Sequence, residues 1–100
     1  MNKDRRTNFR IPLNLPAKYD GMSGAYEAHI EDLSLGGCFV NARGQVESGE
    51  AITVEIKLPS GNWLKLRGEV TACHPGVGFG MVFTSLTTAE ERALQKLIIG

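Results

Sequence analysis

The sequence predicts a mainly β fold, a six-stranded antiparallel β-barrel with a C-terminal α-helix. Six stretches alternate apolar with polar side chains, as strands with one buried face do. Clusters of glycine, proline, asparagine and serine separate these stretches at short intervals, which is typical of antiparallel connections. The C-terminal residues instead show helical spacing. Short strands followed by one helix favour a small barrel, and a chain of 100 residues makes it a single domain.

The first three strands form the N-terminal half of the predicted barrel. The first is expected over residues 13–19, with Pro16 at an edge position because proline cannot donate a ladder hydrogen bond. The second is expected over residues 25–33, and the third over residues 38–42, directly after a pair of glycines. Alternation directs three side chains of the second strand toward the core: Tyr26, Ala28 and Ile30.

Three further strands complete the predicted barrel. The fourth, over residues 52–58, alternates most regularly, and residues 59–62 form a hairpin turn after it. The fifth and the sixth are expected over residues 64–72 and 77–83, with a turn between them. The side chains expected to point inward from these two strands are Leu64, Leu66, Val70, Ala72, Val77, Phe79, Met81 and Phe83.

An amphipathic helix is expected over about residues 87–99. Thr87 with Glu90, or Thr88 with Glu91, has the spacing of a capping box, in which each side chain accepts a hydrogen bond from the other residue's backbone amide. The apolar side chains of one helical face are Ala89, Ala93, Leu94, Leu97 and Ile98. We expect this face to pack on the barrel or close one of its ends, and a partner-binding or dimerising stripe is the alternative.

Composition and charge argue against several classes of function. Apolar residues make up 42% and charged residues 22%, ordinary values for a soluble globular protein. The formal net charge is zero, so the whole chain is not an electrostatic partner for a nucleic acid polymer or a membrane. No apolar stretch approaches the roughly 18–20 residues of a membrane span. The N-terminus also lacks the apolar segment of a signal peptide, which predicts a cytoplasmic protein.

Side chains that usually carry catalysis or metal binding are few and scattered. Cys38 and Cys73 lack metal-ligand spacing and form no cluster with His29 and His74, so we expect free thiols and no metal site. Ser34 has no candidate base within its motif, and no carboxylate pair stands out. The sequence therefore predicts a protein that is not an enzyme and carries no cofactor.

The first of two functional motifs lies in the N-terminal segment. Residues 1–11 are polar and basic without apolar periodicity, which is typical of a flexible arm. Residues 1–10 hold four basic side chains against one acidic, a net charge of +3. Among them, Arg5 precedes an RxxxR pattern formed by Arg6 and Arg10. A solvated tail and an anion clamp both remain open, because arginine also grips phosphate or the O6/N7 edge of guanine.

The second motif is the stretch of residues 32–37, where the second strand is expected to end. In an extended backbone, Asp32 and Ser34 project to one side, while Leu33 and Leu35 point toward the core. The two glycines that close the stretch allow φ > 0 or a close approach to a bulky group. By itself this stretch is compatible with a simple hairpin turn or with half of a ligand site.

Together the two motifs give the chain a family resemblance. Residues 6–10 match RxxxR and residues 32–37 match DxSxxG, in that order and ahead of most of the β pattern. With the predicted barrel and terminal helix, the chain resembles the PilZ domain family of bacterial receptors for cyclic di-GMP from Arg5 to about Ile99. The resemblance implies a single PilZ-like domain over residues 12–100, preceded by the basic arm.

The resemblance also implies a site for cyclic di-GMP, a ligand with two phosphates and two guanines. Arg6 and Arg10 would grip guanine edges and phosphates, and Arg5 would stack on a base or add charge. Asp32 would accept hydrogen bonds from guanine N1–H and N2–H, and Ser34 would add a hydroxyl contact. One or two ligand molecules per chain are both compatible with the family. The remaining implied site residues, which would keep the backbone close to the base, are Gly36 and Gly37.

Signalling is expected to proceed by ordering of the arm. Mobile without ligand and folded over it when bound, the arm would present a new surface to a downstream effector protein. A homodimer is also compatible with the sequence. Two other classes stay open: a protein-interaction module that binds no nucleotide, and a binder of single-stranded nucleic acid like OB-type barrels. Scarce outward-facing aromatic residues and the zero net charge argue against the second.

Overall fold

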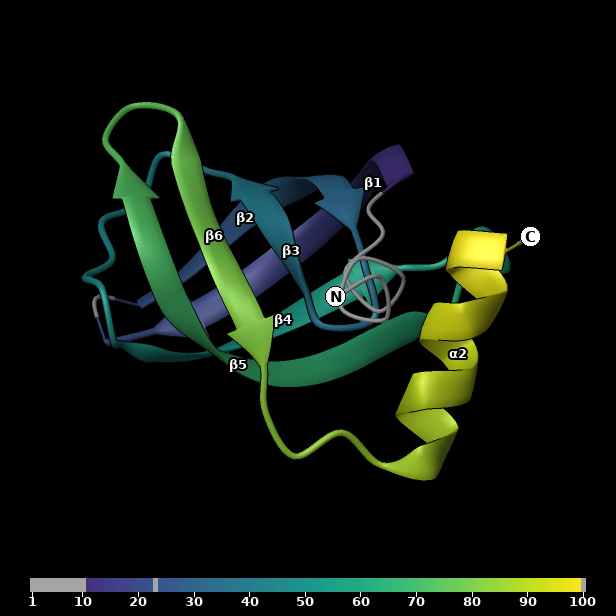
Figure 1. Ribbon diagram of the computed structural model, residues 1–100. Coiled ribbons are helices and arrows are strands. Elements are labelled where there is room, and N and C mark those ends of the chain that lie inside the picture. Colours follow the sequence, from purple (N-terminus) through teal and green to yellow (C-terminus); the bar gives the residue numbers. More distant parts are fainter. Residues whose placement is uncertain (1–10, 23, 100) are drawn as a thin grey trace.

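A computed structural model of the chain shows a small β-barrel with one helix beside one of its ends (Figure 1). The structure describes residues 11–22 and 24–99. The predicted N-terminal arm with its RxxxR motif therefore lies outside the described residues. The elements, in chain order, are β1 (Ile11–Gly21), β2 (Gly24–Leu33), β3 (Gly37–Asn41), β4 (Ala51–Lys57), β5 (Trp63–His74), β6 (Gly78–Phe83) and α2 (Thr88–Ile99).

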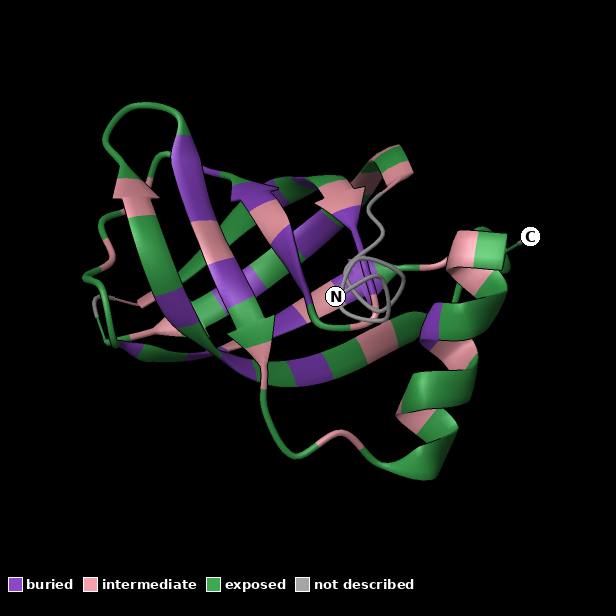
Figure 2. Ribbon diagram, in the orientation of Figure 1, coloured by how far each residue is buried: buried purple, intermediate pink, exposed green. Residues whose placement is uncertain are grey.

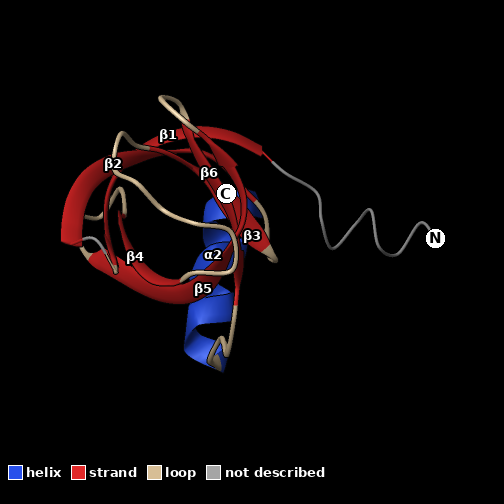
Figure 3. Ribbon diagram, turned by 90° about the vertical axis from the view of Figure 1, so that its left-hand side faces the viewer, coloured by secondary structure: helices blue, strands red, loops and turns tan. Residues whose placement is uncertain are grey.

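All six strands pair antiparallel and close on themselves. The order around the barrel is β1-β2-β3-β6-β5-β4, and β4 pairs again with β1. Figure 3 shows the closed ring of strands with α2 behind it. The predicted fold class, a six-stranded antiparallel barrel with a C-terminal helix, is confirmed. Closure removes the exposed strand edges that would otherwise invite aggregation.

Strand β1 is longer than the sequence predicts. It begins at Ile11, which the sequence assigns to the arm, and the rest of the predicted arm lies outside the described residues. Among the described residues, β1 pairs with β4 only from Ala17 to Asp20, whereas its pairing with β2 starts at Ile11. The first half of β1 therefore borders one strand alone. Proline is tolerated there because one side of the backbone has no ladder to complete.

The barrel interior is filled by inward side chains of every strand, as the alternation of buried and exposed segments in Figure 2 shows. Fully burying one such side chain stabilises the fold by about 1.5–3 kcal/mol. The largest fully buried side chains are Tyr19, Phe79, Ile30, Leu33, Ile56, Leu66, Met81, Leu94, Val40, Val54, Val70 and Cys38.

The strand register shifts at three places, including the β1–β2 pair between Pro12 and Leu15, and the other two shifts break the simple alternation. In β5 the register against β6 shifts between Val70 and Ala72, so Ala72 is exposed and Cys73 turns inward instead. The prediction that Ala72 faces the core is wrong, because an extra residue on one strand reverses the direction of all that follow. In β2 the register against β3 shifts between Ile30 and Asp32, which also reverses the inward and outward positions that follow. It allows Ile30 and Leu33, three residues apart, both to be buried.

Other departures lie at strand ends. Val77 is 52% exposed because it precedes β6 in a turn, where it has no inward position. Tyr26, predicted to face the core, is 36% exposed near the start of β2, although its ring centre lies 5.4 Å from that of Tyr19. Cys38 and Cys73 are free thiols, the first buried and the second half-buried.

Helix α2 starts at the predicted capping box. The Thr87 amide donates to Glu90 Oε1 at 2.9 Å, and the Glu90 amide donates to Thr87 Oγ1 at 3.1 Å. Of the two candidate boxes this confirms the first. Leu94 is fully buried and Leu97 is half-buried against the core, whereas Ala89, predicted on the same face, is exposed. The helix lies beside the barrel end where β5 begins (Figure 1).

In the described part of the chain, no helix is both long and apolar enough to cross a membrane. The same residues hold no group of three or more histidine, cysteine, aspartate or glutamate side chains placed to bind a metal ion.

We predict that Leu94→Ala lowers the free energy of unfolding by about 2–5 kcal/mol, because it removes the buried anchor of α2 and leaves a cavity. Urea denaturation followed by circular dichroism measures the change. The matched control is Ile99→Ala on the same helix, since Ile99 is 83% exposed and should change stability by less than about 0.5 kcal/mol. Equal effects of the two substitutions would show that the helix does not anchor through Leu94.

Candidate functional site

The DxSxxG stretch forms the turn between β2 and β3, and Ser34 organises it. Ser34 is buried, with 2% of its surface exposed. Its hydroxyl donates to the Gly37 carbonyl and accepts from the amides of Gly36 and Gly37, each at 3.2 Å. Its own amide also donates to the Gly37 carbonyl, at 2.9 Å. A hydroxyl offers one donor and two acceptor lone pairs, so the turn uses its full capacity.

The expectation that Asp32 and Ser34 project to the same side applies only to an extended backbone. It assumes an extended backbone, but β2 ends at Leu33 and the chain turns at Ser34. As a result Leu33 and Ser34 are both buried, whereas Asp32 and Leu35 are half-buried. The motif therefore separates into a buried hydroxyl that shapes the turn and a carboxylate nearer the surface.

The two glycines of the motif have different surroundings. Gly37 is buried, and a Cβ placed on it would overlap the carbonyl oxygen of Met81 on β6. Close pairing of β3 with β6 thus requires a glycine at this position regardless of any ligand. Gly36 is exposed, and its carbonyl accepts a hydrogen bond from the Phe83 amide at 2.9 Å, which ties the turn to the end of β6.

Asp32 lies where the described chain begins. Pro12 of β1 pairs with Asp32, and Ile11 pairs with Leu33. Cα atoms of paired residues in antiparallel strands are about 4.5–5.5 Å apart. The first described residues of β1 therefore lie directly beside the DxSxxG turn.

The predicted site residues Arg5, Arg6 and Arg10 lie outside the described residues. Arg10 is bonded to Ile11, so its point of attachment is set by the β1–β2 register. Four residues lie between Arg6 and Ile11, and an extended chain over these five residue steps spans at most about 18 Å. Both arginines of the RxxxR motif are therefore within reach of Asp32.

The barrel surface next to Asp32 is a row of residues from adjacent strands. Asp32 pairs with Phe39 on β3, Phe39 pairs with Gly80 on β6, and Gly80 pairs with Ala72 on β5. Phe39 is half-buried, and its ring lies 5.8 Å from that of His74 at the end of β5, tilted by 49°. A Cβ on Gly80 would only touch the Thr71 hydroxyl at 3.4 Å, so the row is shallow at its centre.

Sequence reasoning missed Phe39 and His74 as candidate site residues. A signal for Phe39 was present, because alternation along the predicted third strand places Phe39 on the face opposite Cys38 and Val40, and the structure shows these two residues buried. No sequence signal placed His74 beside it. The two residues are far apart in the chain, and only the register of β3, β6 and β5 brings their rings together.

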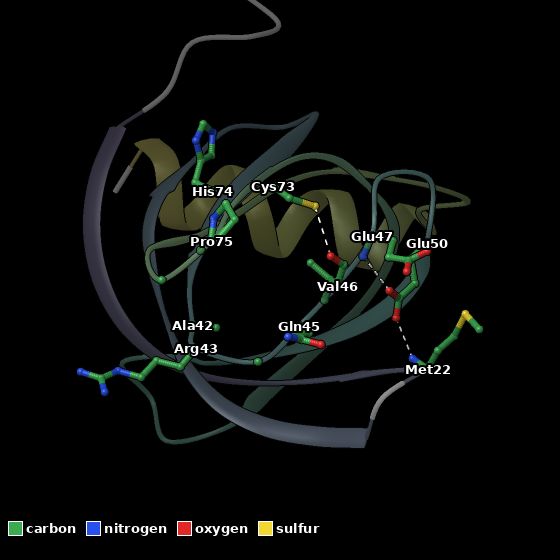
Figure 4. A pocket seen from close by; sticks show the side chains of 13 residues that line it. Met22, Ala42, Arg43, Gln45, Val46, Glu47, Glu50, Cys73, His74 and Pro75 are labelled. Carbon is green, nitrogen blue, oxygen red and sulfur yellow. Dashed lines mark hydrogen bonds between the residues drawn. The ribbon is translucent and has the colours of Figure 1, made fainter.

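A separate hollow of about 580 Å³ opens at the other end of the barrel, among Gln45, Val46, Cys73 and neighbouring residues (Figure 4). Among its lining residues, Glu50 and Cys73 serve the fold. Glu50 accepts from the amides of Met22 at 2.7 Å and Glu47 at 2.9 Å, and the Cys73 thiol donates to the Val46 carbonyl at 3.3 Å. The DxSxxG residues, which the structure describes, do not line this hollow.

Tyr19 is buried close to that end, with its hydroxyl against the backbone of Gly44. Among the described residues this hydroxyl has no well-aligned hydrogen-bond partner. Burial, followed by the neighbouring Tyr26 and Glu50, raises the pKa of Tyr19. The phenol is therefore neutral at physiological pH and serves as a core side chain, its ring edge-on to Phe79 at 5.1 Å.

Comparison with known proteins covers nearly the whole chain. The family model described as the PilZ domain matches residues 4–100, a range that includes both motifs. Among curated proteins, none is similar enough to the chain to count as a match.

Several solved structures share the fold. Bacillus subtilis MotI/DgrA, described as an inhibitor of motility, is 18% identical with a TM-score of 0.73 over 90% of this chain, which spans about half (47%) of MotI. The PilZ domain of CeSA from a cellulose-synthesizing bacterium is 23% identical, with a TM-score of 0.71 over 91% of this chain and 95% of that domain. The PilZ domain of Escherichia coli YcgR, solved with c-di-GMP, is 15% identical, with a TM-score of 0.77 over 91% of this chain and 86% of that domain.

We predict that Ser34→Ala lowers the free energy of unfolding by about 1–3 kcal/mol, because two amides lose their acceptor in a buried turn. Chemical denaturation measures the loss. Ser60→Ala is the control, since Ser60 is exposed in the β4–β5 turn and should change stability by less than about 0.5 kcal/mol. Native stability in Ser34→Ala would contradict the assigned role in shaping the turn.

Proposed function

The chain belongs to the PilZ domain family, and on that premise we propose that it is a receptor for cyclic di-GMP. One observation carries the proposal beyond the family: the register of β1 against β2. It pairs Ile11 and Pro12, which follow the cationic motif in the sequence, with Leu33 and Asp32, and so supports a site to which both motifs contribute. The YcgR structure with c-di-GMP, similar in fold to this barrel, supports the same ligand class.

Within this site, some motif residues contact the ligand and others shape the turn. Asp32 accepts hydrogen bonds from the N1–H and N2–H groups of a guanine, because a carboxylate offers two acceptor oxygens to two parallel donors. Gly36, exposed at the turn, lets the base approach the backbone. Ser34 and Gly37 act mainly through the turn, since the hydroxyl is fully engaged and Gly37 is buried.

The arginines complete the site from the other side. Arg6 and Arg10 contact guanine edges and phosphates, whose charge and planar acceptors match the guanidinium fork. Arg5 adds charge or stacks on a base. Since these residues precede β1, we propose that the arm closes over the bound nucleotide.

The row of residues beside Asp32 offers a flat surface on which a base of the nucleotide can stack. Phe39 and His74 offer planar faces, and Gly80 leaves room for a flat ring between β3 and β5. Stacking of a base on an aromatic side chain is worth about 1–3 kcal/mol. We assign Phe39 to such a contact, next to the guanine held by Asp32.

The role that follows is that of a receptor and adaptor, not of an enzyme. Ordering of the arm over the ligand changes the surface beside β1, and a downstream effector protein binds to the changed surface. The domain would act in the cytoplasm, alone or as a homodimer.

We predict that Arg6→Ala and Arg10→Ala each weaken binding of cyclic di-GMP by about 1.5–3 kcal/mol, because each removes charge-assisted hydrogen bonds. Isothermal titration calorimetry measures the change. Arg92→Ala is the matched control, because Arg92 is exposed on α2. Unchanged affinity in both arm variants would rule out the clamp.

We predict that Asp32→Asn weakens binding of cyclic di-GMP by at least about 1.5 kcal/mol while thermal stability stays nearly intact, because an amide presents a donor where the guanine also presents one. The same titration and a thermal melt measure the two effects. Asp20→Asn, an exposed aspartate of β1, serves as the control. If Asp32→Asn instead unfolded the domain with its affinity for the nucleotide unaltered in the folded fraction, Asp32 would be a structural residue.

A further inference from the structure

A second surface, outside the proposed nucleotide site, combines positive charge with aromatic rings. It is a groove of about 690 Å³ in the barrel wall, which we call the basic groove. Small residues form part of its lining, among them Ala17, Ala28 and Gly44. The charged and aromatic side chains that define its chemistry are Lys18, Arg43, Lys57, Tyr26, His29 and Trp63.

The charge of the basic groove differs from that of the barrel around it. Residues 1–10 account for four of the eleven basic residues and one of the eleven acidic ones. Residues 11–100 therefore hold seven basic and ten acidic residues. Three of those seven basic residues line the basic groove, together with a single carboxylate, that of Glu27. Outside the groove, four basic residues remain against nine acidic ones. A positive groove on a negative barrel favours an anionic partner.

Trp63 lies at one end of the basic groove under two lysines. The Nζ atom of Lys18 is 4.5 Å from the centre of the Trp63 ring and that of Lys57 is 5.9 Å from it. Both are cation–π distances, so the ring gathers the ammonium groups at its face. Glu55 pairs with Lys18 across the β1–β4 ladder and moderates the charge at this end. Trp63 is nevertheless 42% exposed, and exposed tryptophan beside cations is typical of the residues that dominate protein interfaces.

The length of the basic groove distinguishes between kinds of anionic partner. Its lining comes from five neighbouring strands, in the order β5, β4, β1, β2 and β3. Four strand spacings of about 4.8 Å make a path of about 19 Å, the length of about six extended residues. A single planar ring covers only a fraction of this path, whereas an extended peptide follows all of it.

We propose that the basic groove binds an extended acidic segment of a partner protein, with an aromatic or aliphatic side chain of that segment against Trp63. The carboxylates of the segment pair with Lys18, Lys57 and Arg43. The proposal goes beyond nucleotide binding and does not depend on it, because every residue that it uses belongs to the described barrel.

The basic groove ends close to the proposed nucleotide site. His29 and Asn41 line the groove and also line a smaller hollow beside it, together with Glu31. Glu31 accepts a hydrogen bond from the Asn41 side chain at 2.5 Å and directly precedes Asp32 in β2. A segment seated in the groove therefore lies next to the place where the arm joins the barrel.

The test uses the full chain and a fluorescein-labelled acidic peptide of about ten residues, in which Asp and Glu alternate with Leu and one Trp. Fluorescence anisotropy gives its affinity, and amide chemical shifts map its position. We expect shifts at the Trp63 indole and along the groove. Trp63→Ala should weaken binding by about tenfold or more. Lys18→Gln and Lys57→Gln should each weaken it by about two- to fivefold.

Three controls make the result decisive. Lys96→Gln, an exposed lysine on α2, should bind the peptide like the unmodified chain. A peptide with Asn and Gln in place of Asp and Glu should lose the binding. Lys18 and Lys57 are exposed, so their variants decide the question even if Trp63→Ala fails to fold. Unchanged peptide affinity in the groove variants overturns the proposal. So does tighter binding of a single-stranded oligonucleotide that the same substitutions abolish, because the groove would then be a nucleic-acid surface.

Discussion

The hydroxyl of Ser34 holds the corner on which the proposed nucleotide site depends. It joins the amides of Gly36 and Gly37 to one buried oxygen and so turns the chain from β2 into β3 within a few residues. The Gly36 carbonyl then accepts from Phe83 and fixes the same corner to β6. With the corner rigid, Asp32 keeps a defined position beside the start of β1. In the proposed site, this buried hydroxyl would therefore act by placing a carboxylate, without touching the ligand itself.

Most of the fold could be predicted from the sequence, because alternation and turn residues are local properties. The strands, the capping box at Thr87 and the terminal helix all follow from neighbours in the chain. Prediction failed at Ala72, where a bulge adds a residue to β5 that a period of two does not reveal. The motif itself was found by its spacing. The function of Ser34 within it was not, because an extended backbone was assumed where the chain turns.

The parts of the two surfaces that the sequence did not show arise from register. Phe39 meets His74 only through three paired strands, and Lys18 meets Trp63 only because β4 lies between β1 and β5. Barrel closure therefore creates both a flat row beside Asp32 and a basic groove across the neighbouring strands. Since β1 begins beside Asp32 and also lines the basic groove, the two proposed surfaces are neighbours on the barrel.

The central claim is that the barrel carries one half of a nucleotide site and the N-terminal arm the other. Amide chemical shifts of the labelled full chain, recorded during titration with cyclic di-GMP, test it most directly. We expect the amides of residues 5–10 and 32–37 to shift together, with one common dissociation constant, while those of α2 stay in place. Shifts confined to either segment alone, or centred on the far end of the barrel, would contradict the account.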